Sequence, residues 1–110
     1  MGVRLILKDG TLTALLSGEI DHHSARTMRE EIDRALEQAK PRRLVLDFLQ
    51  IRFMDSSGVG LIMGRYKLMM SLGGIVILAN MPPKIEKIIS LAGMDRLTRV
   101  ERNWNHEGNQ

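Results

Sequence analysis

Residues 53–60 read Phe53-Met54-Asp55-Ser56-Ser57-Gly58-Val59-Gly60, and they mark the point where an apolar, strand-like run gives way to a helix-like run. Ser and Asp are preferred at helix N-termini because their side-chain oxygens accept hydrogen bonds from the unpaired amides of the first turn. The glycines allow another backbone or a phosphate to approach closely. A serine at this junction can carry a phosphate, because the exposed amides and the helix dipole favour negative charge. An ordinary capped helix would show the same pattern, so the rest of the chain has to decide between the two.

The residues before this junction predict a hairpin followed by a helix. Apolar runs over residues 3–8 and 11–17 flank Asp9-Gly10, a pair that suits the tight type I′ turn of a β-hairpin. Asp21 is placed to cap a helix that Pro41 ends. The apolar residues between them follow the helical period: Ala25, Met28, Ile32, Ala35, Leu36 and Ala39.

Strands and helices continue to alternate in the rest of the chain. Residues 44–48 are typical of a central strand buried on both faces, and residues 74–79 of another strand. Pro82-Pro83 is expected to start a helix that Gly93 stops, with Ile85, Ile88, Ile89 and Ala92 facing inward. Residues 97–100 can form a last short strand. The element order is therefore ββαβαβαβ, which predicts an α/β fold with a mixed β-sheet, helices packed on it and right-handed crossovers.

The helix that begins at Ser56-Ser57 carries apolar residues on two sides. One side has the spacing of a core stripe that ends near Gly73, and it consists of Val59, Ile62, Met63, Tyr66, Met69 and Met70. The other side combines small residues with leucines that we expect to be exposed: Gly60, Leu61, Gly64 and Leu68. Such a flat apolar surface suits a docking partner. A helix that is simply buried on two sides would explain the same pattern.

The composition is that of one globular domain. The 110 residues suffice for a single core, which Leu, Ile, Val and eight Met must fill because aromatic residues are few. The absence of Cys excludes a disulfide framework, thiolate catalysis and a Cys-based zinc site. No apolar run has the length of a membrane span or of a signal-peptide core, so we expect a cytoplasmic protein without membrane contact. We expect the domain to span residues 1–100 and the polar residues 101–110 to form a flexible tail.

The formal net charge of +3 favours an acidic partner or weak contact with nucleic acid. The basic residues cluster only at Lys40-Pro41-Arg42-Arg43, at the expected junction between a helix and a strand. A solvated loop that completes the helix C-terminus explains this cluster better than a nucleic-acid patch does. We therefore predict no direct contact with nucleic acid.

The chain offers the parts of a catalytic triad but not their arrangement. Ser56 or Ser57, His22 or His23, and Asp21, Asp47 or Asp55 could supply nucleophile, base and orienting group. However, the serines do not lie in a G-x-S-x-G sequence, and so short a chain leaves little room for an enclosed substrate pocket.

The sequence gives equally weak evidence for a metal site and for a nucleotide-binding loop. Asp21-His22-His23 could suggest a metal site, but adjacent side chains at a helix start point in different directions, and no third ligand follows at helical spacing. Gly58-Val59-Gly60 lacks the Lys and the spacing of a P-loop. We predict no enzyme, no metal and no cofactor.

Three motifs together resemble one protein family over about residues 3–100. They are Gly18-Glu19-Ile20-Asp21-His22-His23, the quoted stretch 53–60, and Gly64-Arg65-Tyr66-Lys67, and they are similar to those of the sporulation-type anti-sigma factor antagonists, which are STAS-domain proteins. The resemblance implies a single STAS-like domain without catalytic activity. It also implies that the unphosphorylated form binds an anti-sigma factor that is a serine kinase, with its bound ATP or ADP, and thereby releases the sigma factor that drives sporulation transcription. The kinase then phosphorylates the bound antagonist, and a serine phosphatase removes this phosphate again.

The resemblance also assigns residues. Ser56 is the implied phosphoacceptor and Ser57 the helix cap. The implied partner-binding residues are Asp21, His22, Asp55, Ser57, Gly58, Gly60, Leu61, Gly64 and Leu68. An alternative is a phosphorylatable STAS-type module of another partner-switching pathway, such as a stress response, or one that binds a small anionic ligand.

Phosphorylation of Ser56 can act without refolding the chain. A phosphate adds about −1.5 to −2 charges beside Asp55, in the middle of the expected docking face. An unmatched charge buried in an interface commonly costs a few kcal/mol. The helix N-terminus stabilises the same phosphate in the free protein. We therefore expect a steric and electrostatic switch rather than a conformational one.

Overall fold

The hairpin at the start of the chain forms as predicted. In the computed structural model, which describes residues 2–105, strands β1 (Gly2–Lys8) and β2 (Thr11–Ile20) pair antiparallel. Asp9 and Gly10 between them have φ angles of 52° and 78°. Positive φ at both central residues is what a type I′ turn requires, and Gly adopts it without a Cβ clash.

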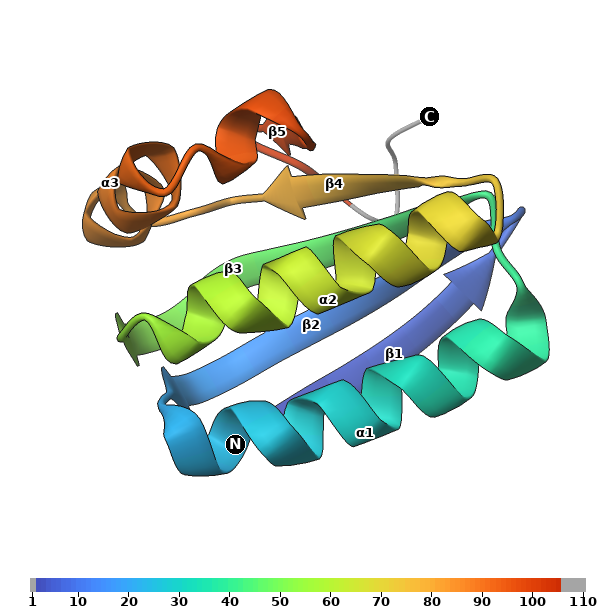
Figure 1. The fold of residues 1–110 in the computed structure, drawn as a ribbon, viewed down its shortest axis with the longest axis horizontal. Coiled ribbons are helices and arrows are strands. Elements are labelled where there is room, and N and C mark those ends of the chain that lie inside the picture. The colour runs from blue at the N-terminus through green and yellow to red at the C-terminus, as the bar shows by residue number, and fades with distance from the viewer. Residues whose placement is uncertain (1, 106–110) are drawn as a thin grey trace.

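The remaining elements alternate as the periodicity predicts (Figure 1). Among the described residues they are α1 (His22–Ala39), β3 (Arg43–Met54), α2 (Ser57–Ser71), β4 (Ile75–Ala79), α3 (Pro83–Leu91), a short 3-10 helix η1 (Met94–Arg96) and β5 (Arg99–Glu101). The sheet order is β1-β2-β3-β4-β5, with β1 antiparallel and the other neighbours parallel. The predicted order ββαβαβαβ and the mixed sheet are confirmed; η1 was not predicted, and β3 is longer than expected.

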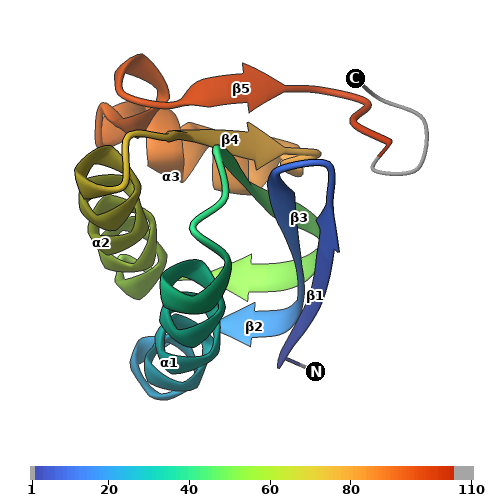
Figure 2. The same cartoon turned by 90° about the vertical axis from the view of Figure 1, so that its right-hand side faces the viewer.

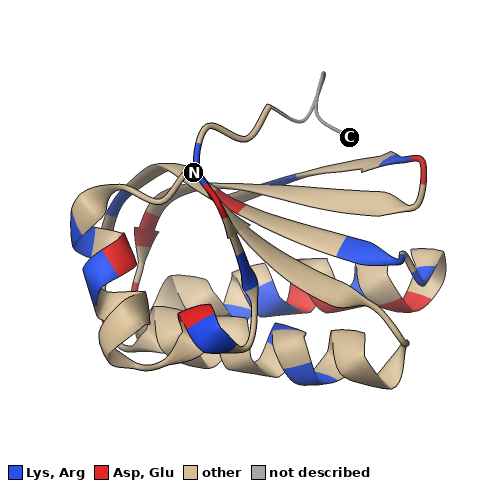
Figure 3. Cartoon of the chain, turned by 90° about the horizontal axis from the view of Figure 1, so that it is seen from above, with Lys and Arg blue, Asp and Glu red and all other residues tan. Residues whose placement is uncertain are grey.

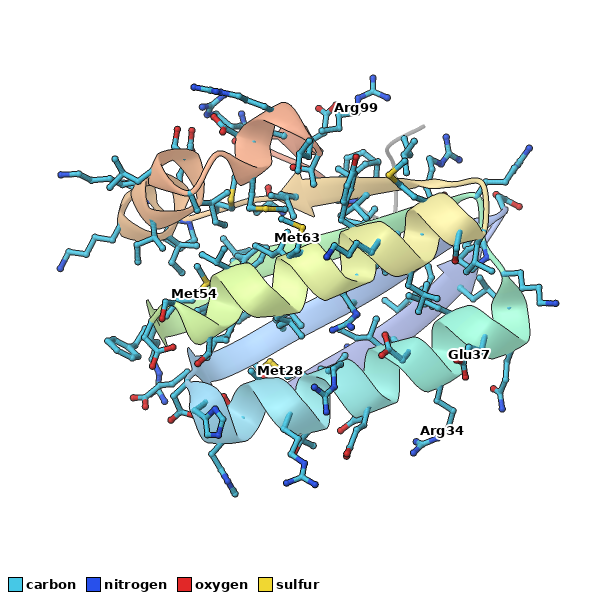
Figure 4. All side chains as sticks on the ribbon, in the orientation of Figure 1. Met28, Arg34, Glu37, Met54, Met63 and Arg99 are labelled. Atoms are coloured by element: carbon cyan, nitrogen blue, oxygen red, sulfur yellow. The ribbon has the colours of Figure 1, made fainter. Side chains whose placement is uncertain are left out.

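Helices α1 and α2 lie side by side on one face of the sheet (Figures 1 and 2). In Figure 4, Met28 reaches from α1 toward the sheet, whereas Arg34 and Glu37 point away from it. The helices and strands share one core cluster, which includes Leu16, Ile20, Ile32, Leu36, Leu46, Phe48, Ile62, Met69, Leu78, Ile85 and Ile89. Helix α3 lies beyond the carboxyl end of β4 (Figure 1) and contributes Ile85 and Ile89 to this cluster.

The opposite face of the sheet carries no helix among the described residues and is covered in part by Trp104. This side chain packs on a small cluster formed by Val45, Ile77 and Ala79. The Trp104 amide donates to Asn80 Oδ1 at 2.7 Å, and Asn80 Nδ2 donates to the Trp104 carbonyl at 2.9 Å. The residues just after 100 are therefore held in place: Glu101 belongs to β5, and Trp104 is fixed through Asn80. The rest of the expected tail, residues 106–110, lies outside the described residues.

Two residues expected to face inward do not. Ala92 is exposed because α3 ends at Leu91 and Ala92 is already its C-cap. Met70 is 59% exposed because its neighbour Met69 takes the inward position at the end of α2.

The basic cluster at residues 40–43 has structural contacts. Lys40 adopts a left-handed conformation at the C-terminus of α1, with φ of 46°. The Arg42 amide donates to the Gly10 carbonyl at 2.8 Å, and Arg43 Nε donates to Thr11 Oγ1 at 2.9 Å. Elsewhere, Lys and Arg are distributed over helices and strands (Figure 3). This cluster therefore joins α1 and β3 to the hairpin.

Candidate partner-binding site

The site is assembled where β2 and β3 end. These strands are parallel neighbours, with Ile20 opposite Met54, so their carboxyl ends meet at one edge of the sheet. The Asp55 amide donates to the Ile20 carbonyl at 3.1 Å and ties the two strand ends together. The N-termini of α1 and α2 begin beside each other at this edge (Figure 1). The motifs around Asp21 and Ser56, which are far apart in the sequence, are thereby adjacent in space.

Asp21 caps α1 as predicted. Its Oδ1 accepts hydrogen bonds from the amides of His23 at 3.0 Å and Ser24 at 2.9 Å, and Ser24 Oγ accepts from the Asp21 amide at 3.0 Å. This reciprocal pair is a capping box. The bond from the Ser24 amide is the main cause that lowers the pKa of Asp21. Asp21 is therefore a negative charge in a fixed position at this edge.

The start of α2 differs from the prediction, because Ser57 is not its cap. Ser57 is the first helical residue and Ser56 occupies the N-cap position. Asp55 Oδ1 accepts from the Ser57 amide at 2.8 Å, as Asp side chains often do two residues on. Because Asp55 supplies the oxygen, the exposed Ser56 side chain makes no capping bond within the described part of the chain.

Gly58 packs closely against the side chain of Met54. It is buried, and a Cβ at this position would lie 2.3 Å from Met54 Sδ. Gly60 and Gly64 differ from it, because a Cβ at either would meet no described atom within 4 Å. Gly58 thus brings α2 close to the end of β3, whereas Gly60 and Gly64 leave the outer side of α2 flat.

The expectation of an exposed Leu61 is wrong. Leu61 is 3% exposed and belongs to the core, and Leu68 is half-buried against that core. The physical reason is that α2 packs on α1 as well as on the sheet. On the second apolar side of α2, Leu61 is therefore buried, whereas Gly60 stays exposed and Gly64 and Leu68 are partly buried.

The contact between the two helices contains an ion pair that sequence reasoning missed. Arg65 Nε lies 2.7 Å from Asp33 Oδ1, although the pair lacks hydrogen-bond geometry, and Arg65 Nη1 donates to the Leu61 carbonyl at 3.3 Å. Burial lowers the pKa of Arg65, and burial also raises the pKa of Asp33 against the opposing effect of Arg65. Arg65 belongs to the motif at residues 64–67, but no spacing in the sequence predicts that its side chain pairs with Asp33.

Of the remaining candidates for catalysis, Asp47 lies away from this edge, whereas His22 and His23 lie at it, at the start of α1. Asp47 lies seven residues before Met54 on β3, roughly 20 Å away along an extended strand. Its carboxylate accepts from the Leu49 amide at 2.9 Å and from Asn80 Nδ2 at 3.0 Å. His22 and His23 are exposed at the start of α1. Within residues 2–105, no three His, Asp or Glu side chains are grouped closely enough to hold a metal ion.

The match to a family model, which covers residues 3–106, decides the family. The chain belongs to the STAS domain family. This STAS domain is 34% identical over 94 residues to an anti-sigma F factor antagonist of Paenibacillus polymyxa, covering 86% of this chain and 80% of the relative. It is 30% identical over 79 residues to the anti-sigma-B factor antagonist of Bacillus subtilis, covering 72% of this chain and 71% of that protein.

Solved structures agree with this assignment. The unphosphorylated form of the anti-sigma factor antagonist SpoIIAA is similar with a TM-score of 0.84 and 30% identity, over 96% of this chain and 91% of that one. The phosphorylated form of SpoIIAA matches with a TM-score of 0.76 and 30% identity, over 96% and 95%. This STAS domain is thus a regulatory binding protein of the anti-sigma factor antagonist type rather than an enzyme. None of its described helices is long and apolar enough to cross a membrane.

Proposed function

We propose that this STAS domain is an anti-sigma factor antagonist switched by phosphorylation of Ser56. In the unphosphorylated state it binds a serine kinase that acts as anti-sigma factor, with its bound ATP or ADP, and the sigma factor for sporulation genes is released. Phosphorylation of Ser56 ends this binding, and a serine phosphatase restores it. All of these steps take place in the cytoplasm.

The exposed Ser56 hydroxyl is the observation that carries the proposal. Because Asp55 caps the Ser57 amide, Ser56 makes no capping bond with the described residues and its hydroxyl is available to a kinase. The similarity to SpoIIAA, which has been solved in phosphorylated and unphosphorylated forms, supports the same assignment.

The charges around Ser56 explain how a phosphate would act. Asp21 and Asp55 already place negative charge at this edge of the sheet, and a phosphate adds about −1.5 to −2 more. A partner that accommodates a neutral serine would have to desolvate this added charge, which commonly costs a few kcal/mol. The N-terminus of α2 stabilises the phosphate in the free protein, so the fold need not change.

The test is phosphorylation by the kinase itself. The chain is incubated with ATP and the anti-sigma factor kinase of its own organism, and intact mass and site mapping follow. We expect one phosphate, on Ser56, that Ser56→Ala abolishes and the matched variant Ser57→Ala retains. A phosphate that persists in Ser56→Ala, or none in the wild type, would refute the assignment.

A second candidate is the same switch in another pathway, such as a stress response. The similarity to the anti-sigma-B factor antagonist favours it. Parallel reactions with the sporulation kinase and with the other anti-sigma kinases of that organism distinguish the two, because the cognate kinase should phosphorylate Ser56 fastest.

A further inference from the structure

A groove runs between the N-terminal halves of α1 and α2, next to the proposed phosphorylation site. Its volume is about 380 Å³. Helix α1 contributes His22, Arg26 and Arg29 to its lining, and α2 contributes Ser57, Gly60 and Arg65. The groove therefore begins at the edge that carries Asp21 and Ser56, and three arginines, Arg26, Arg29 and Arg65, line it together with the apolar residues Ala25 and Leu61.

The positive charge of this groove is only partly neutralised. Arg65 is nearly buried, with a side chain 6% exposed, and it is paired with Asp33. Arg29 is close enough that its charge lowers the pKa of both Asp33 and Arg65. Two guanidinium groups thus act on one carboxylate. Arg26 lies 3.7 Å from Glu30, but both side chains are exposed, and such pairs are weak.

We propose that this groove docks a carboxylate-bearing segment of the anti-sigma factor. The inference rests on the proposed function, because a partner that covers Ser56 also covers the adjoining Ser57 and Gly60. A carboxylate of the partner would relieve the repulsion between Arg29 and Arg65. Gly60 allows close approach, since the space beside it holds no described atom within 4 Å.

The charge pattern also sets the orientation of the partner. Acidic Asp21 and Asp55 lie at the sheet edge, whereas the basic groove extends along α1 and α2 away from it. A partner with the complementary arrangement can dock in one orientation only, because the reversed one would bring like charges together. The arginines of the groove, which contribute to the net positive charge of this chain, would thus help to recognise the partner.

The test compares Arg29→Glu with Arg34→Glu as the matched control. Arg34 is an exposed residue of the same helix, and it points away from α2 and the sheet in Figure 4. Binding to the anti-sigma factor kinase of the same organism is measured by calorimetry at low and at physiological salt. We expect Arg29→Glu to weaken binding about tenfold or more and to reduce its salt dependence, whereas Arg34→Glu changes affinity by less than about threefold.

Further controls separate a loss of the Arg29 charge from misfolding and from nucleotide binding. Arg29→Gln should give an intermediate loss without adding a charge beside Asp33, and thermal unfolding checks that each variant is folded. The loss should be the same whether the kinase is loaded with ADP or with a non-hydrolysable ATP analogue; a loss that depends on the additional phosphate would show that the groove binds a nucleotide phosphate and would overturn the proposal.

The experiments distinguish refutation of the docking proposal from refutation of the proposed function. If the wild type binds the kinase and is phosphorylated on Ser56, but Arg29→Glu binds as tightly as Arg34→Glu, only the groove inference is refuted. If the wild type neither binds nor is phosphorylated, the proposed function is refuted, and the occupant of the groove with it.

Discussion

Gly58 and Ser56 show how single residues prepare the site. Gly58 lets α2 approach Met54 closely, and this contact sets where the helix begins relative to the end of β3. Asp55 then caps the helix through the Ser57 amide. The consequence is that Ser56 lies exposed at the N-cap position, and its side chain makes no capping bond with the described residues.

The contrast between two glycines of α2 tests this packing. We expect Gly58→Ala to lower the free energy of unfolding by about 1 to 3 kcal/mol relative to Gly60→Ala, because the new methyl group displaces Met54. Gly60→Ala should be neutral or slightly stabilising, since Ala is the better helix former and meets open space. Urea denaturation of both variants measures the difference; equal stabilities would show that Met54 moves aside without cost.

At the scale of elements, α2 is held on two sides. The sheet takes up Ile62 and Met69, and α1 packs against the side that carries Leu61 and Arg65. Two apolar sides on one helix therefore reflect two packing partners within the same chain. Exposed residues occur along the whole helix, and the two at the end that carries the proposed site are Ser56 and Gly60.

Truncation of Leu61 measures the contact between the helices. We expect Leu61→Ala to lower the free energy of unfolding by about 2 to 5 kcal/mol, because it removes a fully packed side chain. Met70→Ala, in the same helix but 59% exposed, should change it by about 0.5 kcal/mol or less. Equal effects in denaturant unfolding would contradict the burial of Leu61.

At the scale of the whole molecule, the fold separates stability from recognition. The core lies between the sheet and its helices, whereas the proposed site occupies the edge where parallel strands end and helices begin. Charge can therefore be added at Ser56 without disturbing the core. The ion pair of buried Arg65 and partly exposed Asp33 is the exception, since it places charge between α1 and α2.

The ion pair predicts how stability changes with pH. Burial raises the pKa of Asp33 above 3.8 in the folded protein, so the neutral acid is favoured on folding. The contribution of Asp33 to stability is fully present below pH 3.8, and it is lost as the pH rises through the raised pKa of the folded state. Relative to Asp33→Asn, the wild type should lose stability between acid and neutral pH.

Thermal unfolding of both proteins at several pH values measures this difference. The lowered pKa of Asp21 acts in the opposite direction, because its contribution is lost as the pH falls below 3.8, but it is common to both proteins and cancels. A stability difference that does not vary with pH would show that Asp33 has an ordinary pKa.

Features that depend on neighbouring residues could be predicted from the amino-acid sequence. The Asp9-Gly10 turn, the Asp21 cap, the Pro and Gly boundaries of the helices and the order of elements follow from local backbone and hydrogen-bond preferences. The resemblance of three motifs to known proteins also predicted the family. Three features emerge only in the folded chain: which side of α2 faces α1, the pairing of Arg65 with Asp33, and the hydrogen bonds between Trp104 and Asn80. These contacts join residues distant in sequence, and their energy comes from packing that no local pattern encodes.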